Sequence, residues 1–321
     1  MLAGFDIGGT KCAVTLGEKT QDGLCVLSRN EFPTKGAPSK VIEDMVALLK
    51  DSLTQIGKTE KDVEAVGISC GGPLDGARGV VLSPPNLIGW DEIYVVKEVE
   101  KALGVPAFLC NDADAGALAE WQYGAGKGCK HMVFLTFGTG LGAGLILNGA
   151  LYTGASNFAG ELGHIRLEKH GPVGYGKSGS FEGFCSGAGI AQLAKTRALE
   201  ALQQGNPPSF APDAQSIDNI TAKSVALAAQ QGDALALAVY EEVGENFGRI
   251  CAVLADLLNP ERIIAGGVFM RSHKLMEKAM RRALEREALK GTASVEILPA
   301  ALGEKIGDYA ALSIAAYGLE K

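Results

Sequence analysis

The sequence has only four histidines among its 321 residues and no run of eighteen apolar residues. A bilayer-spanning helix needs about 20 predominantly apolar residues, so we expect no transmembrane helix and no membrane partner. The apolar run Leu2–Phe5 begins at the second residue, which leaves no room for a signal peptide. The seven cysteines are an odd number and form no Cys-x-x-Cys pair. This usage is typical of reduced thiols, so we expect a cytoplasmic protein.

Basic residues are also fewer than acidic ones. The 30 Lys and Arg against 37 Asp and Glu leave a formal net charge of −7. Nucleic acid phosphates are bound by clustered Lys and Arg, so we expect no nucleic acid partner. The length of 321 residues favours two domains with sizeable cores.

A glycine turn lies close to the start of the chain. The segment Asp6–Lys11 reads Asp-Ile-Gly-Gly-Thr-Lys and joins the apolar run Leu2–Phe5 to a second run, Cys12–Leu16. This pattern predicts two strands with a tight turn, in which adjacent glycines let backbone N–H groups approach phosphate oxygens. The candidate nucleotide-binding residues of this turn are Gly8, Gly9, Thr10 and Lys11. An ordinary hairpin is the alternative, although the carboxylate of Asp6 at the strand end can hold a metal ion or its waters.

A second glycine turn makes an ordinary hairpin a weaker interpretation. The strand Met132–Thr136 runs into Phe-Gly-Thr-Gly-Leu-Gly-Ala-Gly at 137–144, and another apolar strand follows. Strand, Gly-Thr turn and strand thus occur twice, about 130 residues apart, which suggests a duplicated architecture with one ligand between two lobes. Two such turns fit a nucleoside triphosphate better than one. The second set of candidate nucleotide-binding residues is Gly138, Thr139 and Gly140.

Strand-like and helix-like segments alternate along the chain. The main expected strands are 63–69, 107–110, 132–136, 262–265 and 295–298, and the main helices are 39–56, 90–103, 112–121, 187–203, 221–231 and 233–258. This alternation predicts an α/β fold with mixed sheets. We expect an N-terminal lobe of residues 1–120 and a C-terminal lobe of residues 121–321. The C-terminal helix, 306–318, is a candidate to pack back on the first lobe.

Seven short motifs occur in order over nearly the whole chain. They are Asp6–Lys11, Gly71–Pro73, Pro84–Trp90, Asn111–Asp114, Gly138–Gly140, Gly160–His164 and Ile263–Gly267. Together they make the sequence resemble the ROK family of sugar kinases and repressors, within the actin–hexokinase-like ATPase superfamily. The resemblance implies a two-lobed α/β fold of ribonuclease H-like type, with mixed sheets and a ligand cleft between the lobes.

The catalytic position implied by the resemblance is Asn111-Asp112. Asp112 follows an apolar strand and begins a helix, where its carboxylate can accept the proton of a sugar hydroxyl that attacks the γ-phosphorus. Asn111 can hydrogen-bond the sugar hydroxyls. Either residue can also cap the helix, and the two roles are compatible. Asp114 is expected to interact only with the helix dipole.

The resemblance implies further contacts to the sugar. Asn86 matches a sugar-binding asparagine and follows two prolines that hold the chain extended, with a polar loop residue as the alternative. Gly72 would let the sugar approach the backbone. Glu161 and His164 are three residues apart and supply the acceptors and donors that vicinal hydroxyls need, although a structural His164 is the alternative. Glu182 matches another carboxylate that contacts the sugar.

The zinc motif of the family is missing. Most members carry Cys-x-Cys-Gly-x-x-Gly-Cys after the histidine, whereas this chain has Val173, Tyr175 and Ser180 at the thiolate positions. One histidine cannot form a closed tetrahedral zinc site, and Cys185 lies at the wrong spacing. We therefore predict no zinc, and we expect packing of Tyr175 and Phe181 to hold this loop.

The implied cofactors are ATP and Mg²⁺, with Asp6 near the ion, holding it through water. Adenosine would lie against Gly266 and Gly267, where simple strand–helix packing is the alternative. The implied reaction is ATP-dependent phosphorylation of a hexose, with glucose at O6 as the first candidate. N-acetylglucosamine, N-acetylmannosamine and fructose are alternatives. Lobe closure on sugar binding is expected, because water must be kept from the γ-phosphate.

Other functions are less consistent with the residues. ROK repressors carry a helix-turn-helix segment ahead of the kinase-like part, whereas this chain starts at the first strand, so we expect no DNA binding. A non-catalytic sugar-binding regulator would not need Asp6, Asp112 and both glycine turns. An acyl kinase or a general ATPase would not need Asn86 or the pair Glu161 and His164. The resemblance and the frequency of twofold oligomers are compatible with a homodimer.

Overall fold

A computed structural model describes residues 1–21 and 23–321 of the chain. These residues fold as two units. Unit 1 comprises Met1–Gly128, Gly144–Ala159 and Ala301–Lys321, and unit 2 comprises Cys129–Ala143 and Gly160–Ala300. The chain therefore passes between the units after residues 128, 143, 159 and 300. From the sequence, a single boundary after residue 120 was expected.

Unit 1 contains a five-stranded sheet with the order β3-β2-β1-β4-β7. Its strands are β1 (Leu2–Ile7), β2 (Lys11–Thr20), β3 (Gly23–Pro33), β4 (Ala65–Cys70) and β7 (Ala107–Asn111). Strand β1 pairs antiparallel with β2 and parallel with β4. The hairpin predicted around the first glycine turn is therefore confirmed, and the sheet is mixed. A short antiparallel pair, β5 (Leu74–Asp75) and β6 (Val80–Val81), accompanies it.

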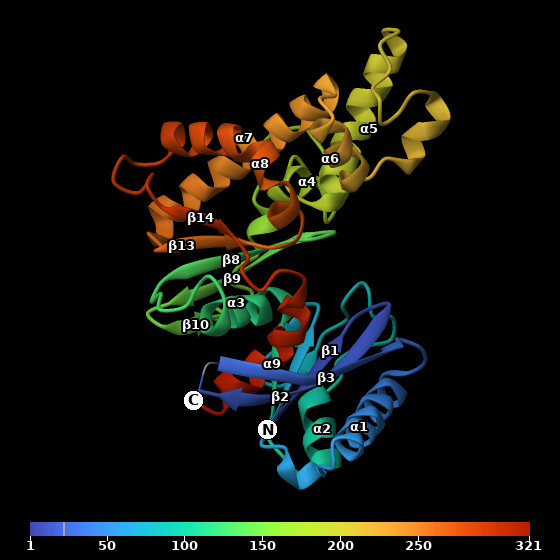
Figure 1. Ribbon diagram of the computed structural model, residues 1–321, viewed down its shortest axis with the longest axis vertical. Helices are drawn as coiled ribbons and strands as arrows, with labels where there is room; N and C mark the ends of the chain where they lie inside the picture. The colour runs from blue at the N-terminus through green and yellow to red at the C-terminus, as the bar shows by residue number, and fades with distance from the viewer. Residues whose placement is uncertain (22) are drawn as a thin grey trace. The chain divides into compact units, whose positions relative to one another are not determined.

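Helices cover both faces of this sheet (Figure 1). They are α1 (Pro38–Gln55), α2 (Val95–Leu103), α3 (Asp112–Tyr123) and α9 (Ile306–Gly318). Alternation along β1 assigns its side chains, because successive residues of a strand point to opposite faces. Phe5 and Ile7 are buried in the core that includes α1 and α2. Leu2 points to the other face and packs with Leu312 of α9.

Two glycines allow α9 to lie directly on the strands. A Cβ atom at Gly4 would lie 2.8 Å from the Cβ atom of Ala311, and one at Gly67 would lie 2.9 Å from that of Ile314. Larger residues at these positions would push the helix away from β1 and β4. The close approach places the start of α9 beside the end of β1, which carries Asp6.

In unit 2, β13 pairs in parallel with both β8 and β14. The second five-stranded sheet has the order β10-β9-β8-β13-β14. Its strands are β8 (Met132–Phe137), β9 (Leu141–Leu147), β10 (Ala150–Tyr152), β13 (Arg262–Ala265) and β14 (Glu296–Pro299). Strands β9 and β10 pair antiparallel, and the residues of β10 belong to unit 1. Parallel and antiparallel pairs thus both occur, which confirms the α/β fold with mixed sheets.

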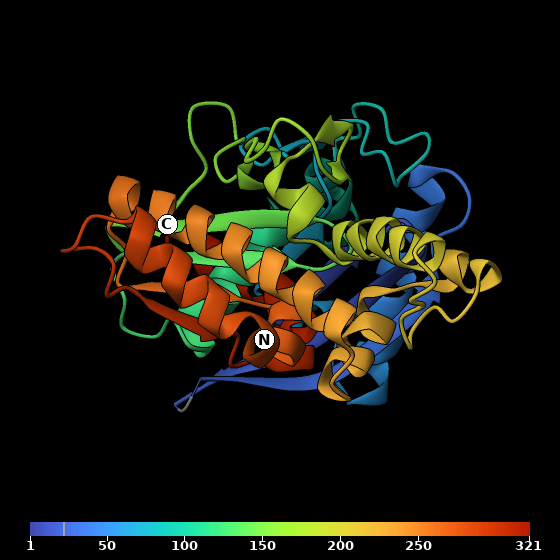
Figure 2. The same cartoon turned by 90° about the horizontal axis from the view of Figure 1, so that it is seen from above.

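The helices of unit 2 are α4 (Phe181–Phe184), α5 (Gly187–Gln203), α6 (Ala222–Gln230), α7 (Ala234–Leu258) and α8 (Gly267–Glu287). The long helices α7 and α8 lie side by side (Figure 2). Shorter elements are β11 (Val173–Gly174), β12 (Lys177–Ser178) and the 3₁₀ helices η1 (Glu60–Asp62), η2 (Leu162–His164), η3 (Ala214–Asn219) and η4 (Gly303–Lys305).

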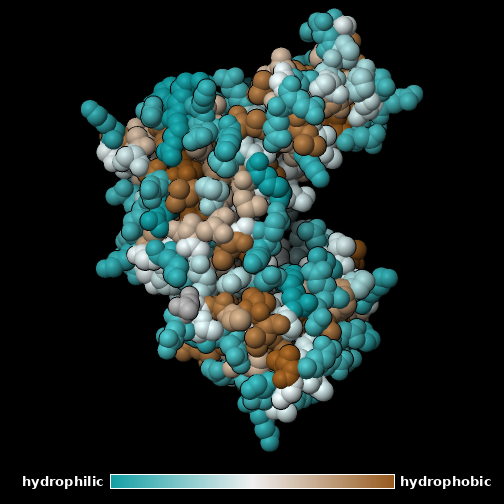
Figure 3. All heavy atoms as spheres, in the orientation of Figure 1, coloured by the Kyte–Doolittle hydropathy of each residue, from teal (hydrophilic) through white to brown (hydrophobic). Residues whose placement is uncertain are grey.

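Hydrophilic residues predominate on the face of the molecule seen in Figure 3, and hydrophobic residues occur there in small groups. Across residues 1–21 and 23–321, no helix combines the length and the apolar character that crossing a bilayer requires.

Candidate active site

The first glycine turn is fixed by backbone and hydroxyl hydrogen bonds. The N–H of Gly8 donates to the carbonyl of Lys11 at 3.1 Å, which closes the turn. Thr34, just after β3, donates from its hydroxyl to the carbonyl of Gly8 at 2.6 Å and from its N–H to the carbonyl of Thr10 at 2.9 Å. The turn is therefore held against β3 before any ligand binds.

The loop that carries Asn86 lies against this turn. A Cβ atom at Gly9 would lie 2.8 Å from the Cβ atom of Asn86, so only glycine allows this approach. The neighbouring Leu87 and Trp90 are buried at 4% and 1% exposure and anchor the loop, which leaves Asn86 itself exposed. Gly72 is also exposed, and a Cβ atom there would meet nothing closer than 3.9 Å. Unit 1 thus brings Asn86 next to the first glycine turn.

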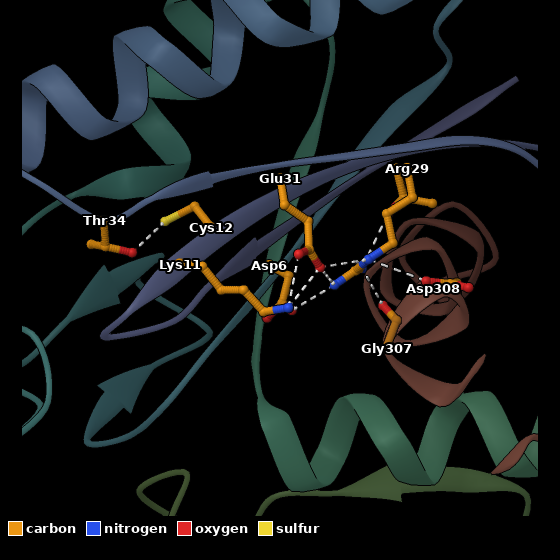
Figure 4. A network of polar contacts seen from close by, with 9 residues as sticks. Asp6, Lys11, Cys12, Arg29, Glu31, Thr34, Gly307 and Asp308 are labelled. Atoms are coloured by element: carbon orange, nitrogen blue, oxygen red, sulfur yellow. Dashed lines mark hydrogen bonds and ion pairs between the residues drawn. The ribbon is translucent and has the colours of Figure 1, made fainter. Parts of the chain in front are cut away.

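Arg29 is the centre of an ionic network around Asp6 (Figure 4). Its guanidinium lies 3.6 Å from the carboxylate of Asp6 and 3.0 Å from that of Glu31. The Nε atom of Arg29 is 3.2 Å from Asp308 of α9. The ammonium of Lys11, predicted to contact phosphate, pairs with Glu31 at 2.8 Å. This network connects the strand ends of β1, β2 and β3 to the first turn of α9.

The charge at Asp6 is only partly balanced. Burial raises the pKa of Asp6, Arg29 acts in the opposite direction, and the negative charge of Asp112 raises it further. Two mutually repelling carboxylates with hard oxygen atoms fit Mg²⁺, which prefers oxygen ligands and keeps several waters. Within the part of the chain that the structure describes, no group of three or more His, Cys, Asp or Glu could hold a metal. Mg²⁺ bound near Asp6 would take its other ligands from water and from phosphate, as this ion usually does in nucleotide sites.

Asn111 and Asp112 begin helix α3. The Oδ1 atom of Asn111 accepts the N–H of Asp114 at 2.7 Å, so the capping alternative holds for this residue. The Oδ1 atom of Asp112 accepts the N–H of Ala113 at 3.0 Å. Solvent reaches the side chain of Asp112, yet the surrounding protein desolvates it and raises its pKa, while backbone N–H donors lower it. An accessible carboxylate with a raised pKa can act as a general base.

The second glycine turn lies between two helix starts in unit 2. The N–H of Gly138 donates to the carbonyl of Gly140 at 3.0 Å, and the N–H of Gly187 in α5 donates to the carbonyl of Gly138 at 2.8 Å. A Cβ atom at Gly267, the first residue of α8, would lie 2.7 Å from the carbonyl carbon of Phe137. The two sets predicted for the nucleotide, 138–140 and 266–267, are thus neighbours. N–H groups at helix starts are suited to phosphate.

A buried aromatic cluster underlies this turn. Phe247 of α7 is stacked on Phe137 and Phe269, with ring centroids 5.8 and 5.0 Å apart, and lies 6.0 Å from Phe181. All four rings are at most 1% exposed. Phe137 precedes the glycine turn, Phe181 begins α4, and Phe269 lies in the first turn of α8. One packing centre therefore positions three parts of the candidate site.

The three side chains of unit 2 that are predicted to contact the sugar occupy different environments. Glu182 accepts the N–H of Leu141 at 2.9 Å, and a Cβ atom at Gly140 would lie 2.7 Å from its Oε2 atom. This bond ties Glu182 to the second glycine turn. Glu161 and His164 are exposed and lie at the two ends of η2, where residues three apart share a face.

The loop that replaces the zinc motif is a hairpin. Strands β11 and β12 are joined by Tyr175 and Gly176, whose φ angles of 44° and 75° are those of a type I′ turn. The side-chain amide of Gln192 in α5 exchanges hydrogen bonds of 3.1 and 2.9 Å with the backbone of Val173. Phe181 is fully buried, as expected, but the expectation for Tyr175 is wrong, because this side chain is 73% exposed. Backbone pairing and Gln192 hold the hairpin instead.

Replacing Arg29 by Ala is expected to lower the free energy of unfolding by about 1 kcal/mol, measured by urea denaturation. The change would leave Asp6, Glu31 and Asp308 without their shared guanidinium. Arg78→Ala is the control, since Arg78 makes an exposed pair with Glu92. Equal stability changes in the two variants would contradict the central role of Arg29.

Three known proteins are similar to the chain over nearly its whole length. A glucokinase of Streptomyces coelicolor is 32% identical over 324 residues, which cover 97% of this chain and 96% of the relative. A ROK hexokinase from Thermus thermophilus is 27% identical, with a TM-score of 0.81 and 99% of both chains covered. A ROK family glucokinase from Streptomyces griseus, in complex with glucose and AMPPNP, is 31% identical, with a TM-score of 0.75 and coverage of 98% and 99%. These structures confirm the actin–hexokinase-like fold class.

A regulator is also among the similar proteins. The DNA-binding transcriptional dual regulator NagC of Escherichia coli is 28% identical over 267 residues, which cover 83% of this chain and 63% of the regulator. The model of the ROK family matches residues 2–317. The match spans both glycine turns, Asp112 and the hairpin without cysteines, and it shows that the chain belongs to the ROK family.

Proposed function

We propose that this ROK protein is a kinase that transfers the γ-phosphoryl group of ATP to a hexose, with O6 of glucose as the first acceptor. The supporting relatives are glucokinases that match almost the whole chain. The observation that carries the proposal is the accessible carboxylate of Asp112, with its raised pKa, at the start of α3. It lies in the same unit as Asp6 and the first glycine turn.

In the proposed reaction, Asp112 accepts the proton of the sugar hydroxyl. The hydroxyl oxygen forms a bond to the γ-phosphorus, and the bond from this phosphorus to the β,γ-bridging oxygen breaks. The products are the sugar phosphate and ADP, and the proton stays on Asp112 until it passes to solvent. The raised pKa makes the carboxylate a stronger base than an ordinary aspartate.

The other residues would bind and orient the substrates. Asp6 would hold Mg²⁺ through water, and the ion when bound would neutralise the β- and γ-phosphate oxygens. The proposed phosphate contacts are Gly8, Gly9, Thr10, Lys11, Gly138, Thr139 and Gly140, with adenosine at Gly266 and Gly267. The proposed sugar contacts are Gly72, Asn86, Asn111, Glu161, His164 and Glu182. Because Lys11 and Glu182 already have partners, their contacts would need an exchange or sharing of hydrogen bonds.

The pH dependence of catalysis follows from the pKa of Asp112. Only the deprotonated carboxylate accepts a proton, so kcat/KM is expected to rise with pH through an acid limb. Because desolvation raises this pKa, the midpoint of the limb should lie above the ordinary aspartate value of 3.8. The measurement is kcat/KM with the preferred sugar across acidic and neutral pH. A midpoint at or below the ordinary value would contradict the environment assigned to Asp112.

A coupled assay of ADP release with a panel of hexoses tests the proposed function. The panel includes glucose, N-acetylglucosamine, N-acetylmannosamine, fructose, mannose and allose. ADP release that depends on one sugar, with the sugar phosphate identified by mass spectrometry, is the expected result. Sugar-independent ATP hydrolysis, or no turnover with any member, would count against a hexose kinase.

A sugar-binding regulator is the second candidate, because the chain is also related to a transcriptional regulator. Its distinguishing result is saturable sugar binding in isothermal titration calorimetry without ADP release. The accessible Asp112 and the two preformed glycine turns favour the kinase, since sugar binding alone does not need a phosphate site.

A further inference from the structure

Glu120 is a fully buried carboxylate in the last part of α3, away from the candidate active site. Its exposure is 0%. The Oε2 atom accepts the N–H of Ala125 at 2.8 Å and that of Ala301 at 3.1 Å, and the Oε1 atom accepts the N–H of Leu302 at 2.8 Å. A buried charge is costly unless it is hydrogen-bonded. Three backbone donors on one side chain satisfy this carboxylate.

These three amides lie where the chain leaves and re-enters unit 1. Ala125 is three residues before the exit at 128, and Ala301 and Leu302 are the first two residues after the return at 300. The backbone carbonyl of Glu120 also accepts the N–H groups of Gly124 and Gly126, at 3.0 and 2.9 Å. One residue of α3 therefore fixes the unit 1 ends of two connections that are far apart in the sequence.

A carboxylate also fixes the exit connection on its unit 2 side. The Oε1 atom of Glu261 accepts the N–H groups of Lys130 and His131, at 2.6 and 3.0 Å. These residues follow the exit directly. The short segment between Gly126 and Lys130 is thus anchored at each end within its own unit.

Only an acidic side chain satisfies the three amides that meet Glu120. A carboxylate accepts with both oxygens, whereas the amide nitrogen of glutamine donates. In Glu120→Gln, the new NH₂ group would face the N–H of Leu302, or the N–H groups of Ala125 and Ala301. The space is also closed, since a Cβ atom at Gly124 would lie 2.6 Å from the carboxyl carbon of Glu120.

Helix α3 joins this anchor to the candidate base. Asp112 begins the helix, and Glu120 follows eight residues later, about 12 Å along the axis at 1.5 Å per residue. The residues from Ala113 to Glu120 are buried, and the helix packs on α9. A displacement of the anchored end would therefore be transmitted along a packed helix to the N-terminal end.

We propose that Glu120 is a positioning residue for phosphoryl transfer, a role that rests on the proposed function. It ties the exit and return connections to the helix that carries Asp112. The backbone at Ala125, Ala301 and Leu302 is thereby held at a fixed position relative to Asp112. Glu120 itself would contact neither substrate. A misplacement of catalytic groups by about 1 Å can cost on the order of 100-fold in rate.

The first test is Glu120→Gln, assayed with the sugar and ATP that the wild type uses. The expected result is a fall in kcat of about 10- to 100-fold, with the KM values for sugar and ATP changed by less than about threefold. This split is expected because the binding groups remain, while the position of the Asp112 carboxylate at the start of α3 changes. Assays are performed well below the unfolding temperature, so that loss of stability alone does not lower kcat.

Two further variants separate positioning from stability. Gly124→Ala displaces the Glu120 carboxylate without changing its charge, so it should lower kcat as Glu120→Gln does. If Glu120→Gln does not fold, Gly124→Ala tests the proposal in its place. Glu100→Gln is the matched control, because Glu100 accepts the N–H of Ala107 at 3.2 Å elsewhere in unit 1. This control should keep the wild-type kcat.

Amide hydrogen exchange gives a readout that does not need activity. Glu120→Gln should speed exchange at Ala125, Ala301 and Leu302, while Glu100→Gln should not. Wild-type kcat in folded Glu120→Gln and Gly124→Ala would overturn the positioning role, as would unchanged exchange at the three amides. A wild type without sugar-dependent ADP release would instead overturn the proposed function, and the exchange pattern would still decide whether Glu120 anchors the connections.

Discussion

Asp112→Asn is expected to lower kcat by about 10²- to 10⁴-fold, the range that general base catalysis contributes. The free energy of unfolding should change by less than about 0.5 kcal/mol, because the side chain is solvent-accessible. The asparagine Oδ1 atom can still accept the N–H of Ala113, so the first turn of α3 keeps its hydrogen bond. What is lost is the ability to take a proton from the sugar hydroxyl. Steady-state ADP release and urea denaturation measure the two quantities.

The control for this variant is Asp51→Asn, which removes an exposed carboxylate from α1. It should leave both kcat and stability close to the wild-type values. Asp112→Ala should also abolish phosphoryl transfer and leave the fold intact. Near-normal turnover in either Asp112 variant would remove the assignment of the base, and a large loss of stability would point to a structural role.

Phe247→Ala is expected to lower the free energy of unfolding by about 3–5 kcal/mol, as usual for truncation of a buried aromatic residue. The ring is 0% exposed and contacts three other phenylalanines, so its removal leaves a cavity that the rigid cluster cannot close. Urea denaturation measures this change. Nucleotide affinity should also weaken, because Phe137 and Phe269 position the second glycine turn and the start of α8.

Phe158→Ala is the matched control, since this phenylalanine is 48% exposed. Its stability should change much less than that of Phe247→Ala. A milder variant, Phe247→Leu, should fall between the two and permits a nucleotide-binding measurement if the alanine variant does not fold. Comparable stability of Phe247→Ala and Phe158→Ala would contradict the packing role of the cluster.

The parts of the structure set by local patterns were predictable from the sequence. The two glycine turns, with their flanking strands, follow from apolar runs interrupted by glycine. The helix at 39–56 matches α1 within one residue at each end, because its apolar residues have helical spacing. The roles of the site residues stay predictions, although the structure places Asn86 beside Gly9 and Glu182 beside Gly140.

Features that depend on distant partners were missed. The residues of β3 show no regular strand pattern, because their burial is irregular, so neither this strand nor the role of Arg29 was predicted. Arg29 meets the carbonyl of Gly307 at a separation of 278 residues, which no local pattern reveals. The three amides around Glu120 belong to the same class, because two of them are 181 and 182 residues away.

One helix boundary was wrong for a reason visible in the core. The helix expected from Trp90 begins at Val95. Trp90 is 1% exposed and fills the core as part of the loop, and Glu92 has a φ angle of 53°, which is incompatible with an α-helix. Trp90 is thus apolar because it packs in the core from a loop, and its spacing from the helix residues is not evidence of a helix.

The packing of α9 on Gly4 and Gly67 has a consequence for synthesis on the ribosome. Leu2 and Ala65 of the first half of the chain are covered by residues that are translated last, including Leu312. In a nascent chain, the part of the first sheet that α9 covers therefore stays exposed until translation is nearly finished. During that interval the sheet is exposed to chaperones and to neighbouring nascent chains, so slow translation of the later segments would prolong the risk of aggregation.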